Sequence, residues 1–420
     1  MRAMRIEGGR PLSGTVQISG AKNAALPALA ATLLTEGQVT LSGIPPVADI
    51  RTMARLLARI GAAVEERSDG YRVRGASEPE PTAPYDLVKT MRASSLVLGP
   101  LAGHYGRARV SLPGGCAIGA RPIDMHLTGL KALGASIGQE RGYIEAVAPR
   151  GGLVGGRIRF RRPTVTGTED LLMAAVLAKG ESVFENAARE PEVVDLADLL
   201  TKMGARIEGA GTRTIHVEGV PSLHGTEHRI IPDRIETGTY LVAGALTAGR
   251  LTIRGTRREH LERVIERMRA AGCRIGSPDA NTLEIDGCTD LTAVDITTRE
   301  HPGFPTDMQA QFMALMTQAS GTSKVVETVF ENRFMHVLEL QRMGADIRIS
   351  GNTAVIRGPA QLSGAQVMAS DLRASACLVL GALAARGTTT LHRIYHLQRG
   401  YANMAEKLRA VGARVEIVDA

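Results

Sequence analysis

Leu57-Ala-Arg-Ile-Gly61-Ala-Ala-Val64 is one copy of a pattern that returns through the whole chain, Leu-x-x-h-Gly-Ala-x-h, where h is apolar. A second signal, an apolar run closed by glycine, precedes each copy, as in residues 29–37. The first set of glycines is Gly61, Gly134, Gly204, Gly272, Gly344 and Gly412, and the second is Gly37, Gly106, Gly180, Gly249, Gly321 and Gly387. Members of the first set lie 73, 70, 68, 72 and 68 residues apart. The sequence therefore predicts six copies of one structural unit.

Each copy has the pattern of a helix followed by a strand. Met53, Leu56, Leu57 and Ile60 are spaced as one face of a helix. A glycine directly after the helix supplies the left-handed conformation in which helices often end. Residues 413–418 alternate apolar and polar, which is typical of a half-buried strand. Because a period near 70 exceeds that of ordinary solenoid repeats, we expect closed α/β domains rather than an open array.

The length of 420 residues suits two domains of three units each. A polar, proline-containing passage at residues 224–232 is the expected boundary, and a second crossing of the chain is expected near Gly20. We therefore predict one domain at residues 21–230 and another made of residues 1–20 plus 231–420. The N-terminal strand, from about residue 4 to residue 19, then belongs to the C-terminal half.

The composition narrows the possible ligands and the location. No apolar run approaches the roughly 18 residues of a membrane span, and the N-terminus lacks the apolar core of a signal peptide. We therefore expect a cytoplasmic protein without membrane association. A net charge of +7 favours anionic ligands. Because aromatic residues make up 3% and tryptophan is absent, small phosphorylated substrates fit better than nucleic acid.

Several common catalytic motifs are missing from the chain. It contains neither a GxxxxGK[ST] phosphate loop nor a complete GxGxxG after a strand, and it lacks HExxH and GxSxG. These absences argue against a P-loop NTPase, a nicotinamide enzyme, a zincin and a nucleophile-elbow hydrolase.

Among the four cysteines, Cys116 has the sequence context of a reactive residue. It lies in Leu112-Pro-Gly-Gly-Cys116-Ala-Ile-Gly-Ala-Arg121-Pro122, whose glycines and prolines predict an exposed loop. Arg121 would favour its thiolate. Cys273 takes the place of an alanine that the other five units share, and Cys377 lies in an apolar run, so we expect both in the core. The sequence around Cys288 predicts neither burial nor reactivity. No cysteine or histidine has zinc-ligand spacing.

Two charged residues stand at the starts of apolar helices. Lys22 and Asn23 precede the first one, where the free amides of a helix N-terminus could help to hold a phosphate or carboxylate. Asp307 opens the equivalent helix of the fifth unit and could act as a base. Purely structural explanations remain open for both residues. Lys22 could be a solvated lysine at the helix cap, and Asp307 could be a first-turn acid that stabilises the helix dipole.

Arginines in segments expected to be loops could pair with phosphate or carboxylate, although each by itself is more often a surface residue. They are Arg92, Arg333, Arg373 and Arg399.

Taken together, these motifs resemble the enolpyruvyltransferase family from the first strand to the last helix. The resemblance is carried by Ser-Gly-Ala-Lys22-Asn23-Ala, Pro113-Gly-Gly-Cys116-Ala-Ile-Gly-Ala-Arg121-Pro, Phe304-Pro-Thr-Asp307-Met-Gln, Phe330-Glu-Asn-Arg333-Phe-Met-His and Asp371-Leu-Arg373-Ala. The cysteine loop is similar to that of the members that act on UDP-N-acetylglucosamine. The shikimate-pathway branch shares the fold but lacks this loop, and it is the second choice.

The resemblance implies a fold and a reaction. The fold would be two inside-out α/β barrels, each of three βαβαββ units with helices buried and sheets outward, and an active site in the cleft between the two domains. The reaction would transfer enolpyruvate from phosphoenolpyruvate to the 3'-hydroxyl of UDP-N-acetylglucosamine and release phosphate. It would be the first committed step of peptidoglycan synthesis. It would need no metal or organic cofactor and no obligate protein partner.

The resemblance also implies residue roles. Cys116 would protonate the methylene carbon and could form a phosphothioketal adduct, while Asp307 would accept the hydroxyl proton. Lys22, Arg121 and Arg399 would bind phosphoenolpyruvate, and Asn23 the intermediate. The remaining substrate contacts would be Arg92, Arg121, Pro122, Ile123, Asp124, Met125, Thr164, Val165, Val329, Arg333 and Arg373. Ala48 stands where family members often have lysine, so no role is assigned to it. A non-catalytic paralogue that kept the fold is the competing interpretation.

Overall fold

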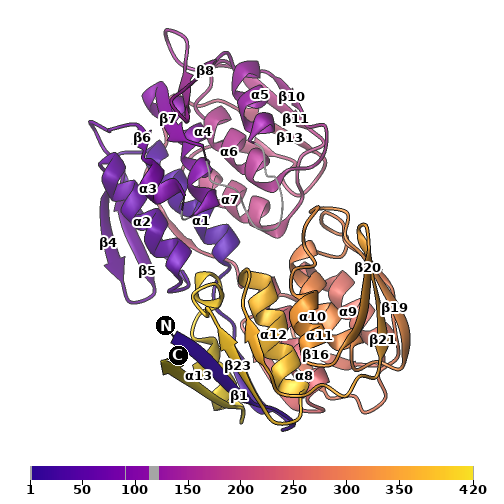
Figure 1. Cartoon of the computed structure of the whole chain (residues 1–420). Coiled ribbons are helices and arrows are strands. Elements are labelled where there is room, and N and C mark those ends of the chain that lie inside the picture. The colour runs from indigo at the N-terminus through magenta and orange to yellow at the C-terminus, as the bar shows by residue number, and fades with distance from the viewer. Residues whose placement is uncertain (1, 90, 113–122, 420) are drawn as a thin grey trace. The chain divides into compact units, whose positions relative to one another are not determined.

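The computed structural model describes residues 2–89, 91–112 and 123–419, and it is an α/β structure with six four-stranded sheets in this part of the chain (Figure 1). The chain divides into two compact units. One contains the described residues of 20–231, and the other contains residues 2–19 together with 232–419. Each unit contains three of the sheets.

Every sheet has the same order, which the fifth repeat illustrates. Its strands β18 (Ile296–Thr297) and β19 (Gly321–Val326) are parallel and are linked by the buried helix α10 (Gln309–Met316). Helix α11 (Val337–Arg342) leads to the hairpin of β20 (Asp346–Ser350) and β21 (Thr353–Gly358). Strand β21 pairs antiparallel with β19, so the order is β18-β19-β21-β20. This arrangement confirms the predicted βαβαββ unit.

In the unit of residues 20–231, the other elements follow the same scheme. They are α1 (Lys22–Ala31), η1 (Thr32–Leu34), β3 (Gln38–Ser42), α2 (Ala48–Ile60), β4 (Ala63–Arg67), β5 (Gly70–Arg74), β6 (Thr82–Ala83), α3 (Tyr85–Val88), η2 (Arg92–Val97), α4 (Leu98–Tyr105), β7 (Arg107–Ser111), α5 (Asp124–Ala132), β8 (Ser136–Glu140), β9 (Tyr143–Val147), β10 (Arg157–Arg159), α6 (Val165–Ala175), β11 (Glu181–Glu185), α7 (Pro191–Lys202), β12 (Arg206–Glu208), β13 (Thr214–Glu218) and β14 (Glu227–Arg229).

The second unit begins with two N-terminal strands and resumes at residue 232. Its further elements are β1 (Arg2–Glu7), β2 (Ser13–Gln17), α8 (Arg234–Leu246), β15 (Arg250–Arg254), η3 (Arg258–His260), α9 (Glu262–Ala270), β16 (Arg274–Asp279), β17 (Thr282–Asp286), η4 (Thr306–Met308), β22 (Gln366–Met368), α12 (Leu372–Ala384), β23 (Thr388–His392), η5 (Leu397–Arg399), α13 (Met404–Ala410) and β24 (Arg414–Asp419).

Strands distant in sequence close each unit. Strand β1 lies between β23 and β24 and is antiparallel to both, whereas β2 is parallel to β15 in a different sheet. The single N-terminal strand expected from the sequence is therefore two strands in two sheets. Strand β14 is parallel to β3, so the polar passage expected as a boundary is partly sheet.

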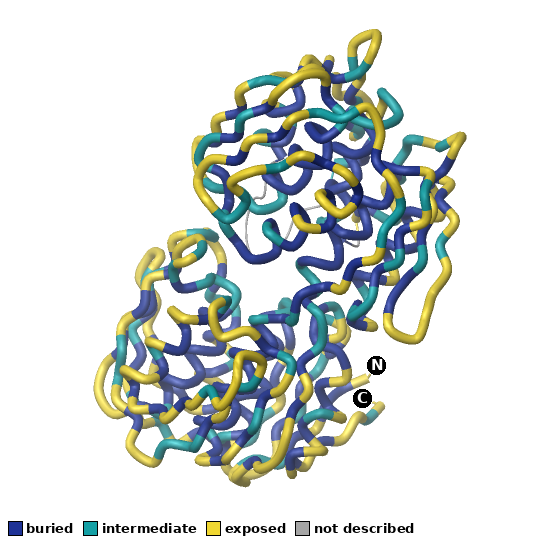
Figure 2. The backbone as a smooth tube through the Cα atoms, turned by 180° about the vertical axis from the view of Figure 1, so that it is seen from behind, coloured by how far each residue is buried: buried dark blue, intermediate teal, exposed yellow. Residues whose placement is uncertain are grey.

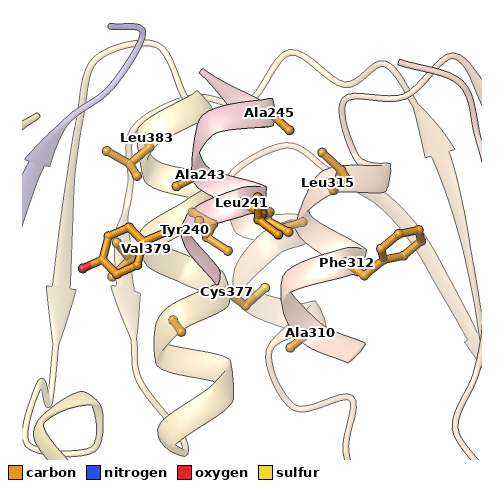
Figure 3. Close-up of a cluster of buried hydrophobic side chains, with 14 of the residues drawn as sticks. Tyr240, Leu241, Ala243, Ala245, Ala310, Phe312, Leu315, Cys377, Val379 and Leu383 are labelled. Atoms are coloured by element: carbon orange, nitrogen blue, oxygen red, sulfur yellow. The ribbon is translucent and has the colours of Figure 1, made fainter. Parts of the chain in front are cut away.

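Three central helices fill each unit. Helices α1, α4 and α6 pack together in one unit, and α8, α10 and α12 in the other. Figure 3 shows the second triplet, where Leu241, Phe312 and Cys377 lie among neighbouring apolar side chains and are fully buried. Strands such as β13 alternate exposed and buried residues, and the buried residues gather inside each unit (Figure 2). Helices inside and sheets outside agree with the predicted inside-out barrels.

Glycine is needed at the repeated positions for two different structural reasons. All six glycines of the Leu-x-x-h-Gly-Ala-x-h pattern adopt the left-handed conformation, with φ between 90° and 112°, as predicted. In the other set, Gly37 and Gly249 do not have positive φ. A Cβ atom on Gly37 would lie 2.5 Å from Gly225 N, and one on Gly249 would lie 2.1 Å from Leu12 O. These two glycines instead allow the backbone before β14 and β2 to approach closely.

Two expectations from the sequence concern buried cysteines and membrane-spanning segments. Cys273 and Cys377 are buried, as their apolar contexts indicate. Across residues 2–89, 91–112 and 123–419, no helix has both the length and the apolar character needed to cross a membrane.

Candidate active site

The predicted site residues of the first unit stand at the N-terminal ends of its central helices. Lys22 is the first residue of α1, and Arg92 is the first residue of η2, which leads into α4. Thr164 is the N-cap of α6, where its side-chain oxygen accepts from Gly167 N at 3.3 Å. Helices α1, η2 and α6 contact one another. The fold therefore brings these residues to one end of the helix triplet.

Lys22 forms a largely buried ion pair within this unit. Its Nζ lies 3.2 Å from Oδ2 of Asp49, and the two side chains are 12% and 7% exposed. Asp49 lies in the first turn of α2, directly after Ala48. Such a pair fixes the direction of the ammonium group because either charge alone would be costly to bury. Asp49 was not among the predicted residues.

The segment after the cysteine loop begins helix α5. Ile123 is its buried N-cap, while Asp124 and Met125 form its first turn and are partly exposed. The carboxylate of Asp124 accepts a hydrogen bond from Arg161. Cys116, Arg121 and Pro122 were also predicted here, and they lie outside the described residues.

In the second unit, Asp307 lies between two arginines. Its Oδ1 accepts from Arg333 Nη2 at 2.6 Å, and its Oδ2 accepts from Arg373 Nη2 at 2.8 Å. Both arginine side chains are almost fully buried, at 5% and 6% exposed, whereas 26% of the Asp307 side chain is exposed. Asp307 is part of η4, which precedes α10, and Arg373 lies in the first turn of α12. The structure therefore joins three predicted residues in one cluster.

Electrostatics hold this carboxylate ionised. Burial by itself raises the pKa of Asp307, but the guanidinium groups of Arg373 and Arg333 outweigh burial and keep that pKa well below its usual range. Burial likewise lowers the pKa of Arg373, and the charge of Asp307 outweighs it, so the net shift is upward. At neutral pH the cluster therefore carries two positive charges and one negative charge.

Each arginine of the cluster is positioned by its own neighbours. Asp371 caps α12 and accepts from the backbone N of Arg373 at 2.8 Å. The guanidinium of Arg373 lies 5.4 Å from the centre of the Tyr401 ring, and that of Arg333 lies 5.0 Å from the Phe330 ring. Arg333 Nη1 also donates to Thr306 Oγ1 at 2.8 Å.

A buried polar network lies directly beneath Asp307. Gln311 Nε2 donates to the backbone oxygen of Asp307 at 2.9 Å and to Tyr401 Oη at 3.2 Å. Tyr401 Oη in turn lies 2.9 Å from Thr239 Oγ1. These residues come from α10, from the segment between η5 and α13, and from α8, so the backbone of Asp307 is braced by all three repeats of the unit.

Val329 and Arg399 complete the predicted residues of this unit. The backbone N of Val329 donates to Glu327 Oε1 at 2.8 Å, and Glu327 Oε2 accepts from Thr306 Oγ1 at 2.8 Å. Arg399 ends η5. Burial and the charge of Arg399 lower the pKa of the nearby His396.

The four arginines expected in surface loops lie in three different settings. Arg333 is in an irregular segment but is buried, Arg373 is a buried helical residue, and Arg92 and Arg399 belong to the 3-10 helices η2 and η5. Arg373 and Arg333 are buried because Asp307 neutralises part of their charge. The pattern Asp371-Leu-Arg373 could have indicated a helix start, since aspartate is a preferred N-cap.

Sequence reasoning also missed ionisable groups buried on α6 and α5. Burial raises the pKa of Asp170 to about 8. Burial, with the neighbouring charges of Glu192, Glu190 and Asp170, also raises the pKa of Glu169. Burial lowers the pKa of His126 to about 4, with Arg92 contributing. The position of Glu169 and Asp170 in an otherwise apolar helical run was the available signal.

The described residues offer no obvious place for a metal ion. Within residues 2–89, 91–112 and 123–419, no three His, Cys, Asp or Glu side chains are grouped so that they could hold one.

Comparisons with known proteins place the chain in a family. The family model of EPSP synthase (3-phosphoshikimate 1-carboxyvinyltransferase) matches residues 6–408. UDP-N-acetylglucosamine 1-carboxyvinyltransferase of Solibacter usitatus (strain Ellin6076) is 60% identical over 414 residues, which cover 99% of each chain. The protein of the same name from Myxococcus xanthus (strain DK1622) is 56% identical over 413 residues, which cover 98% of each chain.

Solved structures agree with this placement. The enolpyruvyl transferase NikO from Streptomyces tendae has a TM-score of 0.90 and 27% identity, and the match covers 100% of this chain and 99% of NikO. EPSP synthase from Acinetobacter baumannii, at 17% identity and a TM-score of 0.77, shares the fold over the full length of both chains. The chain therefore belongs to the enolpyruvyltransferase family, among the UDP-N-acetylglucosamine 1-carboxyvinyltransferases.

Proposed function

We propose that this enzyme transfers the enolpyruvyl group of phosphoenolpyruvate to the 3'-hydroxyl of UDP-N-acetylglucosamine and releases phosphate, as the first committed step of peptidoglycan synthesis. The observation that carries the proposal is the Asp307 cluster, in which an ionised carboxylate is held between two buried cations. Relatives named UDP-N-acetylglucosamine 1-carboxyvinyltransferase, which are 56–60% identical over nearly the full length, support the choice of acceptor. It is a transferase that acts on small molecules, in the cytoplasm, and needs neither a protein partner nor a cofactor.

Addition requires a proton for the methylene carbon and a base for the attacking hydroxyl. Cys116 delivers the proton and can bond to phosphoenolpyruvate through sulfur, and Asp307 takes the hydroxyl proton. Lys22, Arg121 and Arg399 bind the phosphate and carboxylate of phosphoenolpyruvate, and Asn23 contacts the intermediate. The sugar nucleotide contacts Arg92, Arg121 to Met125, Thr164, Val165 and Val329.

The arginines beside Asp307 have a further part in this mechanism. A carboxylate whose pKa lies well below its usual range is a weak base. Anionic substrate groups that approach Arg333 and Arg373 offset their positive charge. Each close charge pair contributes roughly 4 kcal/mol at 4 Å and an effective dielectric constant of 20, before desolvation. Substrate binding therefore raises the pKa of Asp307 toward the range in which it can accept a proton.

The ion pair of Lys22 with Asp49 supports the proposed role of the lysine. Because Asp49 holds the ammonium group at the N-terminal end of α1, a bound phosphate meets both the lysine charge and the free amides of that helix. The pair keeps Lys22 in place without neutralising the helix end.

A coupled phosphate-release assay tests the proposal. With phosphoenolpyruvate and UDP-N-acetylglucosamine together we expect steady release, and with either substrate alone none. Turnover with shikimate 3-phosphate in place of the sugar nucleotide would support the other branch of the family. A folded sample that is silent with both acceptors would identify a non-catalytic paralogue.

Alkylation by the epoxide fosfomycin tests the thiol separately. Mass spectrometry of the intact protein should show one adduct, which Cys116→Ser abolishes and Cys377→Ser retains, since Cys377 is fully buried in α12. Wild-type protein that stays unmodified would contradict the assignment of Cys116.

A further inference from the structure

Two cysteines lie at the open end of one hairpin in the unit that contains residues 232–419. Strands β16 and β17 pair Arg274 with Asp286 at that end. Cys273 directly precedes the hairpin, and Cys288 follows it by two residues. The thiol of Cys288 donates to the backbone oxygen of Gly272 at 2.6 Å, so its sulfur lies against the peptide group that leads into Cys273. Both residues are free cysteines and pack in the same apolar core.

Backbone hydrogen bonds fix both flanks of this pair. Cys273 N donates to Met268 O at 3.0 Å, and Gly287 N donates to Gly249 O at 2.6 Å. The backbone on both sides of the two cysteines is therefore held in place in the folded chain. A disulfide requires Cβ atoms about 3.5–4.5 Å apart, which adjacent chains at a hairpin end can provide.

In the first repeat, the position equivalent to Cys288 packs against the glycine that caps the outer helix. There the equivalent residues are Ala62, after Gly61, and Ala76, two residues past β5. A Cβ atom on Gly61 would lie 3.3 Å from the Cβ of Ala76. The side chain after the last strand thus packs onto the segment that caps the outer helix. Only in the fourth repeat do both positions carry a thiol.

The two thiols differ in their access to solvent. Cys273 is 4% exposed, whereas Cys288 is partly exposed. Burial and the neighbouring Cys288 raise the pKa of Cys273, so its thiol is protonated until it reacts. Oxidation therefore begins at Cys288, and Cys273 is the partner that completes it.

We propose that Cys273 and Cys288 form a redox-active dithiol that a hydroperoxide converts to an intramolecular disulfide. In the first step the sulfur of Cys288 attacks the peroxide, the O–O bond breaks, and with hydrogen peroxide the products are a sulfenic acid and water. In the second step the sulfur of Cys273 displaces the hydroxyl of that sulfenic acid, and its proton leaves with the hydroxyl as a second water. Both sulfurs are oxidised, and the peroxide is the only species reduced.

Peptide mapping of the full chain tests the proposal. Reduced protein is treated with a few equivalents of hydrogen peroxide, remaining thiols are blocked with N-ethylmaleimide, and the sample is digested with trypsin without reductant. Cleavage after Arg274 separates residues 270–274 from 275–299. We expect these two peptides to be linked in most molecules, two hydrogens lighter than their sum, and to separate again after dithiothreitol. Recovery of Cys273 as its maleimide adduct, with Cys288 either blocked or overoxidised, would overturn the proposal.

Two variants make the result specific. Cys273→Ala should fold, because alanine occupies this position in the other five repeats, as Ala62, Ala135, Ala205, Ala345 and Ala413. In that variant we expect a sulfenic acid on Cys288 that dimedone traps, and no linked peptide. Cys377→Ala should leave the link at the wild-type level. A linked peptide that contains Cys377 in place of Cys273 would contradict the pairing.

Discussion

Arg373 Nη2 lies 2.8 Å from Asp307 Oδ2, and this contact joins the first turn of α12 to the 3-10 turn that precedes α10. The two residues belong to neighbouring repeats, 66 positions apart. Arg333 Nη2 donates to the other oxygen, so each carboxylate oxygen of Asp307 accepts a hydrogen bond from an arginine. The orientation and the charge of the proposed base are therefore set jointly by Arg333 of its own repeat and by Arg373 of the next one.

Replacing Arg373 should change the acidity of Asp307. In Arg373→Gln one of two compensating cations is lost, so we expect the pKa of Asp307 to rise and the acid limb of the kcat/KM profile to move up by about one pH unit or more. The pH dependence of kcat/KM measures this, and a carbon NMR titration of the carboxyl group serves if turnover is too slow. Arg342→Gln is the control, because that arginine is 61% exposed and pairs with Glu339. Identical profiles for wild type and Arg373→Gln would refute the coupling.

The Lys22 and Asp49 pair should matter for both activity and folding. Asp49→Asn removes the carboxylate that orients the ammonium group, and we expect kcat/KM to fall at least tenfold, mainly through binding of phosphoenolpyruvate. Steady-state kinetics with each substrate varied will separate KM from kcat. Asp86→Asn serves as the comparison, since its pair with Lys89 is highly exposed and should be worth less than about 1 kcal/mol. Equal effects of the two substitutions would show that Lys22 needs no such support.

Asp170 should make stability fall as pH rises. Its folded pKa is about 8 because of burial, whereas an unfolded aspartate titrates near 3.9. The folded state therefore binds the proton more tightly, and the stability from this group is complete below pH 4 and is lost as pH rises to 8, by about 1.4 kcal/mol per pH unit. Asp170→Asn does not titrate and keeps an oxygen that can accept from Gly99 N, which now donates to Oδ1 at 2.7 Å.

We expect Asp170→Asn to be several kcal/mol more stable than wild type at pH 8 and nearly equal to it at pH 4. Thermal unfolding across this range is the measurement. Asp69→Asn, which changes an exposed partner of Arg229, should show no such trend. Parallel curves for wild type and Asp170→Asn would mean that Asp170 is charged in the folded protein.

The repeated left-handed glycines can be tested where nothing crowds them. Gly412 has φ of 96°, and a Cβ atom there would meet no atom within 4 Å. Gly412→Ala should therefore cost about 1–2 kcal/mol from backbone conformation alone. Gly276→Ala lies in the same unit, has no left-handed backbone and meets only Glu284 Cβ at 4.0 Å, so we expect little change. Urea unfolding of both variants measures the change in the free energy of unfolding. An equal decrease in the two would contradict the conformational explanation.

The repeat pattern was sufficient to predict closed α/β domains built from copied units, whereas the inside-out arrangement was implied only by the family resemblance. Leu57, Ile60 and Gly61 carry a local signal, because helix periodicity and a left-handed cap depend on adjacent residues. The positions of β1 between β23 and β24 and of β14 beside β3 depend on pairing between residues far apart in sequence, which no local pattern contains.

The sequence motifs named candidate site residues but not the contacts between them. Asp307, Arg333 and Arg373 were identified from motifs, yet their mutual pairing follows from the packing of α10 against α12. Asp49 gave no signal because its partner Lys22 is 27 positions away. Burial of Arg373 was missed for the same reason, since an arginine enters a core only where an acid meets it.

The closing strands set an order of events during synthesis. Strand β14 completes its sheet once residue 229 has been made, so the unit of residues 20–231 can assemble while the ribosome is still translating. Strand β1, in contrast, pairs with residues 388–391 and 414–419. At 5–20 residues per second, β1 is made about 20–80 s before these partners. During that interval its edges are open to other chains, so β1 needs protection by chaperones.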